Sequence, residues 1–261
     1  MIEQKTTVFR KLAIHGFNAV NNGHNLYALL EFDITNIRSM LRSRRMAGSG
    51  GSLFSFLLKV IGKCLEDFPE FNSMVSLKNT SFFKEVDINI PIEIEHDNRK
   101  YTKQQIIRNI NSKSISAVDK EIEEAKQNRD NKKGFISSEK TAALLGVLPG
   151  IIVRIIFRIV MSSHRRIRDL SGTVFVTSVS MFTNVPGYII PYSGGPKAVS
   201  FAVGSSMKKP VAVNDKIEIR EMINITIIFN HDSVDGAPAA RFINQLRKYI
   251  ESDFEQFLFE K

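Results

Sequence analysis

The stretch that decides the fold is NITIIFNHDSVDGAPAARFINQL, residues 224–246. Residues 224–229 are apolar and rich in β-branched side chains, which predicts a buried strand. From about residue 236 to 251, apolar residues recur at helical spacing, which predicts a helix with one buried stripe. The stripe consists of Ala239, Phe242, Ile243, Leu246 and Ile250. The short polar segment between strand and helix is therefore held in a rigid place.

His231 lies in that polar segment, directly after the strand. An imidazole has an unperturbed pKa near 6.5, so it can take up a proton at neutral pH, and at a strand end it can reach a cleft. Asp235, at the start of the helix, can accept hydrogen bonds from backbone amides or pair with an arginine, and Gly236 permits close backbone approach. On spacing alone an alternative stays open, in which His231 is a polar loop residue and Asp235 a helix cap.

Further strands and helices surround this segment. Strands are predicted at residues 25–33, 86–95, 173–179, 198–203 and 209–220, and helices at about 36–45, 53–67 and 103–128. Pro91 hints that its strand lies at an edge of the sheet. A hairpin centred on Asn214 and Asp215 joins two of the strands. Residues 46–52 are rich in glycine and serine but lack the ending of a phosphate-binding loop, so they predict a linker.

The whole-chain composition excludes several classes of protein. A chain of 261 residues with 43% hydrophobic residues can form one large domain or two small ones. It contains no metal-binding Cys or His pair and no glycine-rich nucleotide loop, so we expect no metal. The lone Cys64 has helical apolar neighbours, which predicts a buried thiol. No secretory signal is present at the N-terminus, so we expect a cytoplasmic protein.

The formal net charge of +9 at pH 7 favours acidic partners, among them anionic membranes, phosphate-rich ligands and carrier proteins. Nucleic acid is the weakest candidate, because the arginines are not interleaved with aromatic residues in a recognisable module. We therefore expect no nucleic-acid partner.

Residues 142–161 are nearly all apolar but include Pro149, Arg154 and Arg158. A membrane-spanning helix needs about 20 apolar residues, and each arginine at mid-bilayer would cost about 2.5–3.5 kcal/mol, so a transmembrane helix is not predicted. Two alternatives stay open, a buried or interface helix and a helix lying on a membrane surface. The basic residues 164–168 fit the second as well as a solvated face. We expect one or two helices, broken or kinked at Pro149.

Residues 230–242 closely resemble the H-x-x-x-D-G signature shared by chloramphenicol acetyltransferase and the catalytic domain of dihydrolipoamide acyltransferases. Residues 240–246 resemble the last helix of the former. Other stretches match the family in the same order along the chain. They are residues 32–37, 68–72, 86–90, 171–181 and 208–211. The resemblance predicts a single catalytic domain, residues 1–261, with a helical insertion atypical of the family at about 130–168.

This resemblance implies a chloramphenicol acetyltransferase-like α/β fold, a two-layer sandwich in which helices cover a mixed β-sheet. It also implies a homotrimer with active sites between neighbouring subunits. His231 would be the general base that deprotonates coenzyme A or the acceptor. The hydroxyl that binds the oxyanion, a serine in the family, falls on Thr177, or on Ser178 if the alignment shifts by one residue. Asp235 would hold the active-site loop through Arg10.

The expected enzyme is an acyltransferase that moves acyl groups other than aminoacyl groups. The resemblance implies coenzyme A or acyl-coenzyme A as a substrate, and a small molecule, a dihydrolipoyl arm or a carrier-protein thiol as acceptor. The sequence begins at the catalytic domain, so we expect a free-standing member without a covalently bound lipoyl group. A competing interpretation is an inactive trimeric homologue that binds a partner or a membrane peripherally through residues 130–168.

Overall fold

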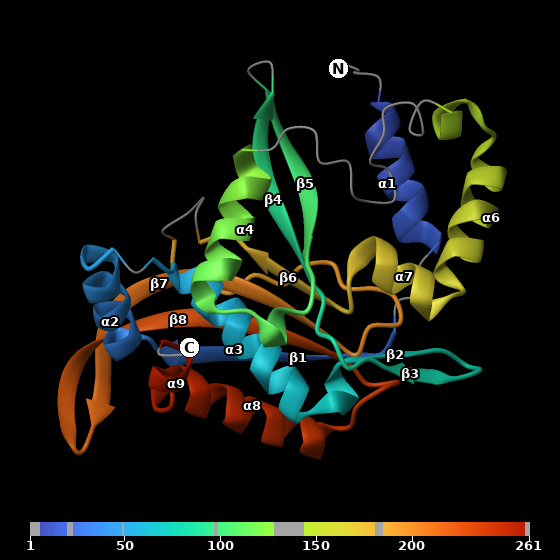
Figure 1. Cartoon of the computed structure of the whole chain (residues 1–261). Helices are drawn as coiled ribbons and strands as arrows, with labels where there is room; N and C mark the ends of the chain where they lie inside the picture. The colour runs from blue at the N-terminus through green and yellow to red at the C-terminus, as the bar shows by residue number, and fades with distance from the viewer. Residues whose placement is uncertain are drawn as a thin grey trace, which may run out of the picture.

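The body of the protein is a mixed β-sheet covered by helices in the computed structural model, which describes residues 6–19, 23–48, 50–96, 99–127, 144–180 and 185–258 (Figure 1). The strands are β1 (Asn25–Asp33), β2 (Ser73–Val75), β3 (Thr80–Phe82), β4 (Ile88–His96), β5 (Arg99–Ile107), β6 (Val174–Ser178), β7 (Val199–Val213) and β8 (Lys216–Asn230). The helices are α1 (Val8–Ala19), α2 (Thr35–Met46), α3 (Leu53–Asp67), η1 (Pro69–Phe71), η2 (Ile110–Ser112), α4 (Ile115–Gln127), α6 (Gly150–Met161), α7 (His164–Ser171), α8 (Gly236–Glu251) and α9 (Glu255–Leu258).

Six strands form the main sheet in the order β1-β8-β7-β6-β4-β5, and β2 pairs with β3 in a separate small sheet. β6 runs parallel to both of its neighbours, β4 and β7, whereas the other pairs in the sheet are antiparallel. The predicted α/β fold with a mixed sheet is confirmed.

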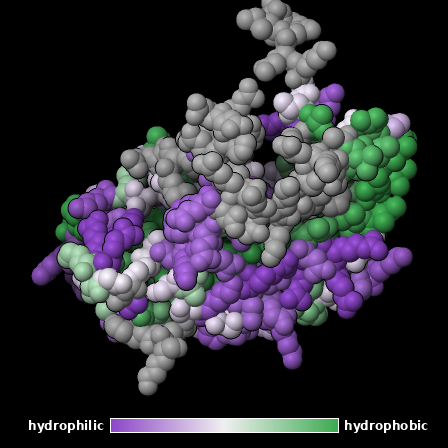
Figure 2. Space-filling view, turned by 45° about the horizontal axis from the view of Figure 1, so that its top comes forward, coloured by the Kyte–Doolittle hydropathy of each residue, from purple (hydrophilic) through white to green (hydrophobic). Residues whose placement is uncertain are grey.

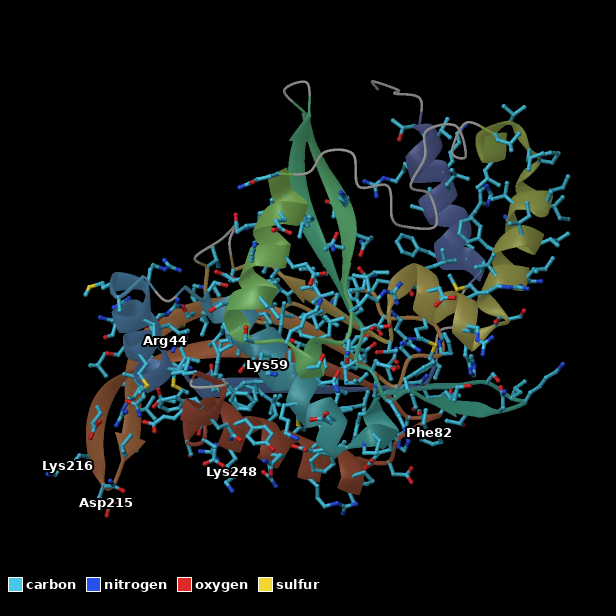
Figure 3. All side chains as sticks on the ribbon, in the orientation of Figure 1. Arg44, Lys59, Phe82, Asp215, Lys216 and Lys248 are labelled. Carbon is cyan, nitrogen blue, oxygen red and sulfur yellow. The ribbon has the colours of Figure 1, made fainter. Side chains whose placement is uncertain are left out.

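The hairpin of β7 and β8 dominates the sheet. Asn214 and Asp215 in its turn have φ values of 49° and 62°, a left-handed conformation that these residue types tolerate and that a two-residue hairpin turn requires. The predicted turn is confirmed, but two long strands replace the three short ones expected at 198–203, 209–220 and 224–229. The pairing register of β7 with β8 shifts between Val203 and Ser206. This irregularity interrupts the alternation of side chains within the single strand β7. Figure 3 shows Asp215 and Lys216 at the hairpin tip, which extends away from the body.

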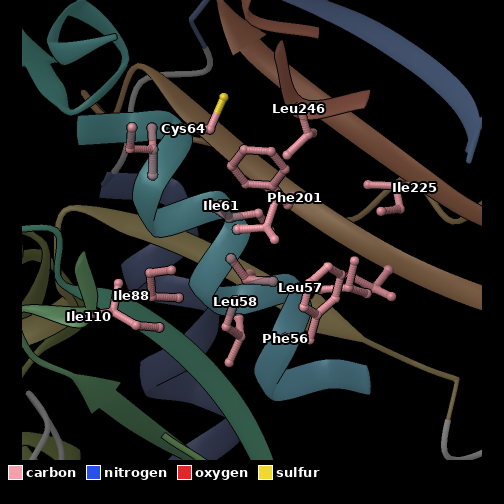
Figure 4. Close-up of a cluster of buried hydrophobic side chains, with 14 of the residues drawn as sticks. Phe56, Leu57, Leu58, Ile61, Cys64, Ile88, Ile110, Phe201, Ile225 and Leu246 are labelled. Atoms are coloured by element: carbon pink, nitrogen blue, oxygen red, sulfur yellow. The ribbon is translucent and has the colours of Figure 1, made fainter. Parts of the chain in front are cut away.

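Helices α3, α4 and α8 pack on one face of the sheet and enclose the main hydrophobic core. α3 is buried almost all round, because apolar residues occupy most of its positions. Figure 4 shows Phe56 and Ile61 of this helix in the same cluster as Phe201 of β7. The Cys64 thiol donates a hydrogen bond to the carbonyl of Phe242 at 3.7 Å, and burial raises its pKa. The prediction of a buried thiol is confirmed.

The predicted helix over 103–128 is wrong in its first part. Residues up to Ile107 form the edge strand β5, and α4 follows only after η2. Ile107 lies opposite Ile88 of β4 and both are buried, so the sheet takes up apolar residues that also fit a helical spacing. Asn109 then adopts a left-handed φ of 51°, which ends the strand. The edge is thus β5 and not β4. Pro91 is accommodated because β4 pairs with β6 only at its first two residues.

Helices α1 and α6 lie side by side (Figure 1), and a second, smaller hydrophobic cluster joins them. Its buried members are Leu12, Leu145, Val153 and Phe157. Residues 144–147 are helical and Pro149 immediately precedes α6, which confirms the predicted break at this proline. The part of the predicted insertion up to residue 143 lies outside the described residues. Across the described ranges, no helix is both long and apolar enough to cross a membrane.

Candidate active site

His231 is the first residue after β8, at the end of the sheet where β1 begins. Its backbone N–H donates a hydrogen bond to the carbonyl of His24 at 2.6 Å. The following turn closes on Asn230, whose carbonyl accepts from the backbone of Ser233 and Val234 at 2.9 and 3.1 Å. The backbone around His231 is thereby fixed on both sides, while 44% of the His231 side chain remains exposed.

Asp235 occupies the N-cap position of α8, but its side chain makes no capping hydrogen bond. Its Oδ1 lies 3.6 Å from Nδ1 of His231, which is an ion-pair distance and too long for a hydrogen bond. The Asp235 side chain is 84% exposed, so water screens the pair strongly. Within the described residues no hydrogen bond engages Nε2 of His231, so this nitrogen is available to accept a proton.

Arg10 and Gly236, the two predicted supporting residues, contribute little within one chain. Arg10 lies in the first turn of α1, and no ion pair among the described residues links it to Asp235. Its structural role stays a prediction. Gly236 begins α8, and a Cβ added there would meet no atom within 4 Å, so close approach inside this chain does not require the glycine.

Thr177 and Ser178 end β6 and point to opposite faces of the sheet, because side chains alternate along a strand. Ser178 shares its face with the buried Val174 and Val176, and its hydroxyl oxygen lies 2.8 Å from that of Ser180. Thr177 faces away from the helical layer. The geometry favours Thr177 over Ser178 as a hydroxyl directed out of the core.

Thr177 and His231 do not meet within one chain. Thr177 lies opposite Ala202 of β7, which lies opposite Thr226 of β8, and His231 follows five residues later. Two strand spacings and five residues of strand rise separate the two positions by roughly 19 Å. Side chains of this size cannot span that distance, so their convergence requires a second copy of the chain.

His24 is a neighbour of the site that no motif in the sequence singles out. Its Nδ1 lies 2.8 Å from Oδ1 of Asp232, and this hydrogen bond, together with the carboxylate charge, raises the pKa of His24. The antiparallel pairing of β1 with β8 brings it there, since Asn25 lies opposite Asn230. The sequence carries no local signal for this contact, because it depends on the pairing of two strands that lie far apart in the chain.

A pocket of about 270 Å³ opens beside the start of β1. It is lined by Gly23, Asn25, Tyr27, Pro191, Tyr192 and Ser193. The Asn25 side chain donates to the carbonyl of Ser193 at 3.4 Å, which ties the two walls together. A Cβ added at Gly23 would lie 2.8 Å from Oδ1 of Asn230, so the glycine allows this close approach. The pocket therefore adjoins the His231 end of the sheet.

A buried charge cluster around Asp87 ties α7 to the sheet. The Asp87 side chain is 1% exposed, and its carboxylate accepts three hydrogen bonds, from Arg108 (2.8 Å), Arg168 (2.9 Å) and the backbone N–H of Asn109 (3.0 Å). Burial works to raise the pKa of Asp87, but these donors outweigh it and lower the pKa below its ordinary value. Burial, with repulsion from Arg108, lowers the pKa of nearby Lys197 to about 7. In the described part of the chain, no three His, Cys, Asp or Glu residues form a group that could hold a metal.

The sequence of the chain matches a family described as 2-oxoacid dehydrogenases acyltransferase (catalytic domain) over residues 3–139 and 163–259. Residues 140–162 lie between the two matched ranges. The lipoamide acyltransferase component of the branched-chain alpha-keto acid dehydrogenase complex of Bacillus subtilis (strain 168) is 25% identical over 235 residues, 87% of this chain and 46% of the relative. The chain thus spans about half the length of this curated relative.

Two solved structures show the same fold. The dihydrolipoamide acetyltransferase of Azotobacter vinelandii, solved to study the role of a serine, a histidine and an asparagine in its catalytic mechanism, matches with a TM-score of 0.72. The two are 18% identical, and the match covers 99% of this chain and 94% of that one. A chloramphenicol acetyltransferase matches with a TM-score of 0.53 at 12% identity, over 96% and 100% of the chains. The resemblance found in the sequence is confirmed, and the chain belongs to the 2-oxoacid dehydrogenases acyltransferase catalytic-domain family.

Proposed function

We propose that this chain transfers acyl groups between coenzyme A and an acceptor thiol or hydroxyl, with His231 as the general base. The observation that carries the proposal is the placement of His231. Its backbone is anchored at the end of a buried strand, its ring is exposed, and within the described residues its Nε2 has no hydrogen-bond partner. A base held in this way can meet a substrate proton without prior rearrangement.

The proposed reaction begins when Nε2 of neutral His231 takes the proton of the acceptor. The acceptor thiolate or alkoxide attacks the carbonyl carbon of the acyl thioester and forms a tetrahedral intermediate. Its oxyanion accepts a hydrogen bond from the hydroxyl of Thr177 on the adjacent subunit. Collapse of the intermediate breaks the bond from carbon to the sulfur of coenzyme A. The leaving thiolate takes the proton from the imidazolium, which returns His231 to its neutral form.

The separation of Thr177 from His231 supports assembly of more than one copy of the chain, and the family resemblance implies that the assembly is a trimer. Two surfaces near the site are also apolar and exposed in the single chain. On β1, Tyr27 and Leu29 face away from the helical layer, and Tyr188 and Ile190 lie exposed in the segment before β7. A neighbouring subunit on this side would bury them and bring its own hydroxyl to the site.

The acceptor is proposed to be a small molecule, a dihydrolipoyl arm or a carrier-protein thiol. The name of the Bacillus subtilis relative, a lipoamide acyltransferase, supports the dihydrolipoyl arm. The net charge of +9 suits the phosphates of coenzyme A or an acidic carrier. Salt-sensitive binding of an acidic carrier, with salt-insensitive binding of an uncharged acceptor, would support the role of this charge.

A thiol-release assay tests the proposal. Acetyl- and longer acyl-coenzyme A are supplied with dihydrolipoamide and a panel of small acceptors, and free coenzyme A is measured. The His231→Ala variant should lose roughly a hundredfold to ten-thousandfold of the turnover, because the proton then has no acceptor. His164→Asn, which alters a histidine on α7, is the matched control and should stay active. Full turnover by His231→Ala, or no turnover and no coenzyme A binding by the native chain, would overturn the proposal.

A further inference from the structure

Helix α6 presents two apolar faces, and only one of them is covered. Val153 and Phe157 pack with Leu12 of α1 in the small cluster. The opposite side carries an exposed stripe of residues spaced four apart: Ile151 (70% exposed), Ile155 (51%) and Ile159 (55%). Residues four apart lie above one another on a helix, so the stripe runs along the whole of α6.

The exposed stripe belongs to a larger hydrophobic surface. Figure 2 shows hydrophobic residues gathered over α6, at the right of the molecule, with hydrophilic residues below them. Leu144 and Val147, in the helical residues before Pro149, are also exposed and extend this surface. Single exposed apolar residues are ordinary, whereas a contiguous patch marks a docking surface. α6 has 12 residues, so it is too short to cross a bilayer and can dock only along one.

Arginines border the stripe on one side. Arg154 and Arg158 follow Ile151 and Ile155 by three residues, are exposed, and form no ion pair among the described residues. The helices α1, α6 and α7 together contain seven arginines and lysines but only one aspartate and no glutamate. A second copy meeting this face symmetrically would bring like charges together, whereas an anionic surface would neutralise them.

We infer that α6 docks on an anionic phospholipid surface. The isoleucine stripe enters the boundary of the acyl chains, and Arg154 and Arg158 reach the lipid phosphates. Long arginine side chains suit this arrangement, because their stems lie along apolar surface while the guanidinium group stays among the headgroups. The inference goes beyond acyl transfer, since it places the catalytic domain at a membrane without involving His231.

Contacts of α7 attach the docking helix to the body. His164, at the start of α7, hydrogen-bonds through Nδ1 to the Ser81 hydroxyl at 2.8 Å. Arg168 pairs with Asp87 at 2.9 Å and with Glu85 at 3.0 Å. Because α7 follows α6 after only two residues, docking of α6 would give the sheet a defined orientation relative to the bilayer.

Vesicle flotation of the full chain tests the inference. The vesicles contain phosphatidylcholine alone or phosphatidylcholine mixed with phosphatidylglycerol, and the native chain should bind the mixed vesicles much more tightly. Replacing Ile151, Ile155 and Ile159 together by serine should lower the partition coefficient roughly a hundredfold or more. The double variant Arg154→Gln, Arg158→Gln should lower it about thirtyfold on the mixed vesicles and little on the neutral ones.

The matched control replaces two isoleucines of similar exposure elsewhere. Ile217 and Ile219, at the β7–β8 hairpin, are 81% and 64% exposed. The double variant Ile217→Ser, Ile219→Ser should float like the native chain. These two residues lie on the hairpin, so they do not belong to the proposed docking stripe on α6. Circular dichroism and thiol release establish that every variant is folded.

The chain contains no tryptophan, which allows an independent readout. Ile155→Trp places a single indole in the stripe, and Ile219→Trp places one on the hairpin. Mixed vesicles should shift the emission of the first to shorter wavelength and leave the second unchanged. Equal behaviour of the two, or native flotation of the triple serine variant, would overturn the inference. The inference would also be overturned if the native chain bound neither kind of vesicle and the triple serine variant lost the native oligomeric state. A second copy of the chain would then cover this face.

Discussion

Helices α3 and α6 are both strongly apolar, yet only α3 is enclosed. Lys59 of α3 is buried and donates to the carbonyl of Asn111 at 3.0 Å, so even a charged residue there has a partner inside the body. α6 touches α1 with one face and leaves Arg154 and Arg158 exposed. A core helix and a docking helix can therefore have similar apolar content. They differ in where their charged residues lie and in which groups those residues contact.

The largest expected effect is in α3. Phe56→Ala should lower the free energy of unfolding by about 3–5 kcal/mol, because Phe56 is fully buried and the cavity cannot close completely. Ile155→Ala on the exposed stripe of α6 should change it by less than about 0.5 kcal/mol. Urea unfolding followed by circular dichroism compares the two. Similar losses would mean that α6 is buried against something in solution.

The contact between α1 and α6 should be worth less than the main core. Phe157→Ala should lower stability by about 3 kcal/mol, the lower end for a buried phenylalanine, because its cluster is small and lies beside solvent. Hydrogen exchange should accelerate in α1 and α6 while α3 keeps its protection. Uniform acceleration across all helices would show that the two hydrophobic clusters unfold as one unit.

A smaller effect should appear where α7 is tied to the sheet. The pKa of Asp87 is lowered in the folded protein from its ordinary value of 3.8, so its charge stabilises the fold above that pH. This stabilisation is lost as the pH falls below 3.8 through the folded pKa. Arg168→Gln should cost about 1 kcal/mol at neutral pH, since one partner of the carboxylate is removed and Arg168 is partly exposed.

The Arg168→Gln variant should also lose less stability than the native chain between pH 4 and pH 2, because the pKa of Asp87 is then lowered less on folding. Unfolding curves over this pH range measure the effect. A parallel loss in both proteins would mean that Arg168 does not lower the pKa of Asp87. Arg247→Gln, which breaks an exposed pair with Glu251 on α8, is the matched control.

The sequence predicted those elements best whose signals are local. α8 was predicted with its bounds, because its apolar stripe repeats every turn, and the hairpin followed from Asn214 and Asp215. β5 was mistaken for helix because Ile106, Ile107 and Ile110 also fit a helical spacing. The strand becomes apparent only through its pairing with the preceding strand β4, in which His96 lies opposite Arg99.

The sequence indicates candidate site residues but not how they are arranged in space. His24 reaches Asp232 only because β1 pairs with β8. The gap between Thr177 and His231 depends on the strand order β8-β7-β6, which no stretch of sequence encodes by itself. A site that needs a second chain likewise leaves no local trace in the sequence.

The central claim is that His231 acts with Thr177 of another subunit, and complementation tests it most directly. His231→Ala and Thr177→Ala chains are prepared separately, and each should be inactive or nearly so in thiol release. When equal amounts of the two chains are co-refolded, about a quarter of all the sites should combine an intact histidine with an intact threonine, and activity should return to about that fraction of the native level. Mixed oligomers that form but remain as inactive as either parent would contradict the account.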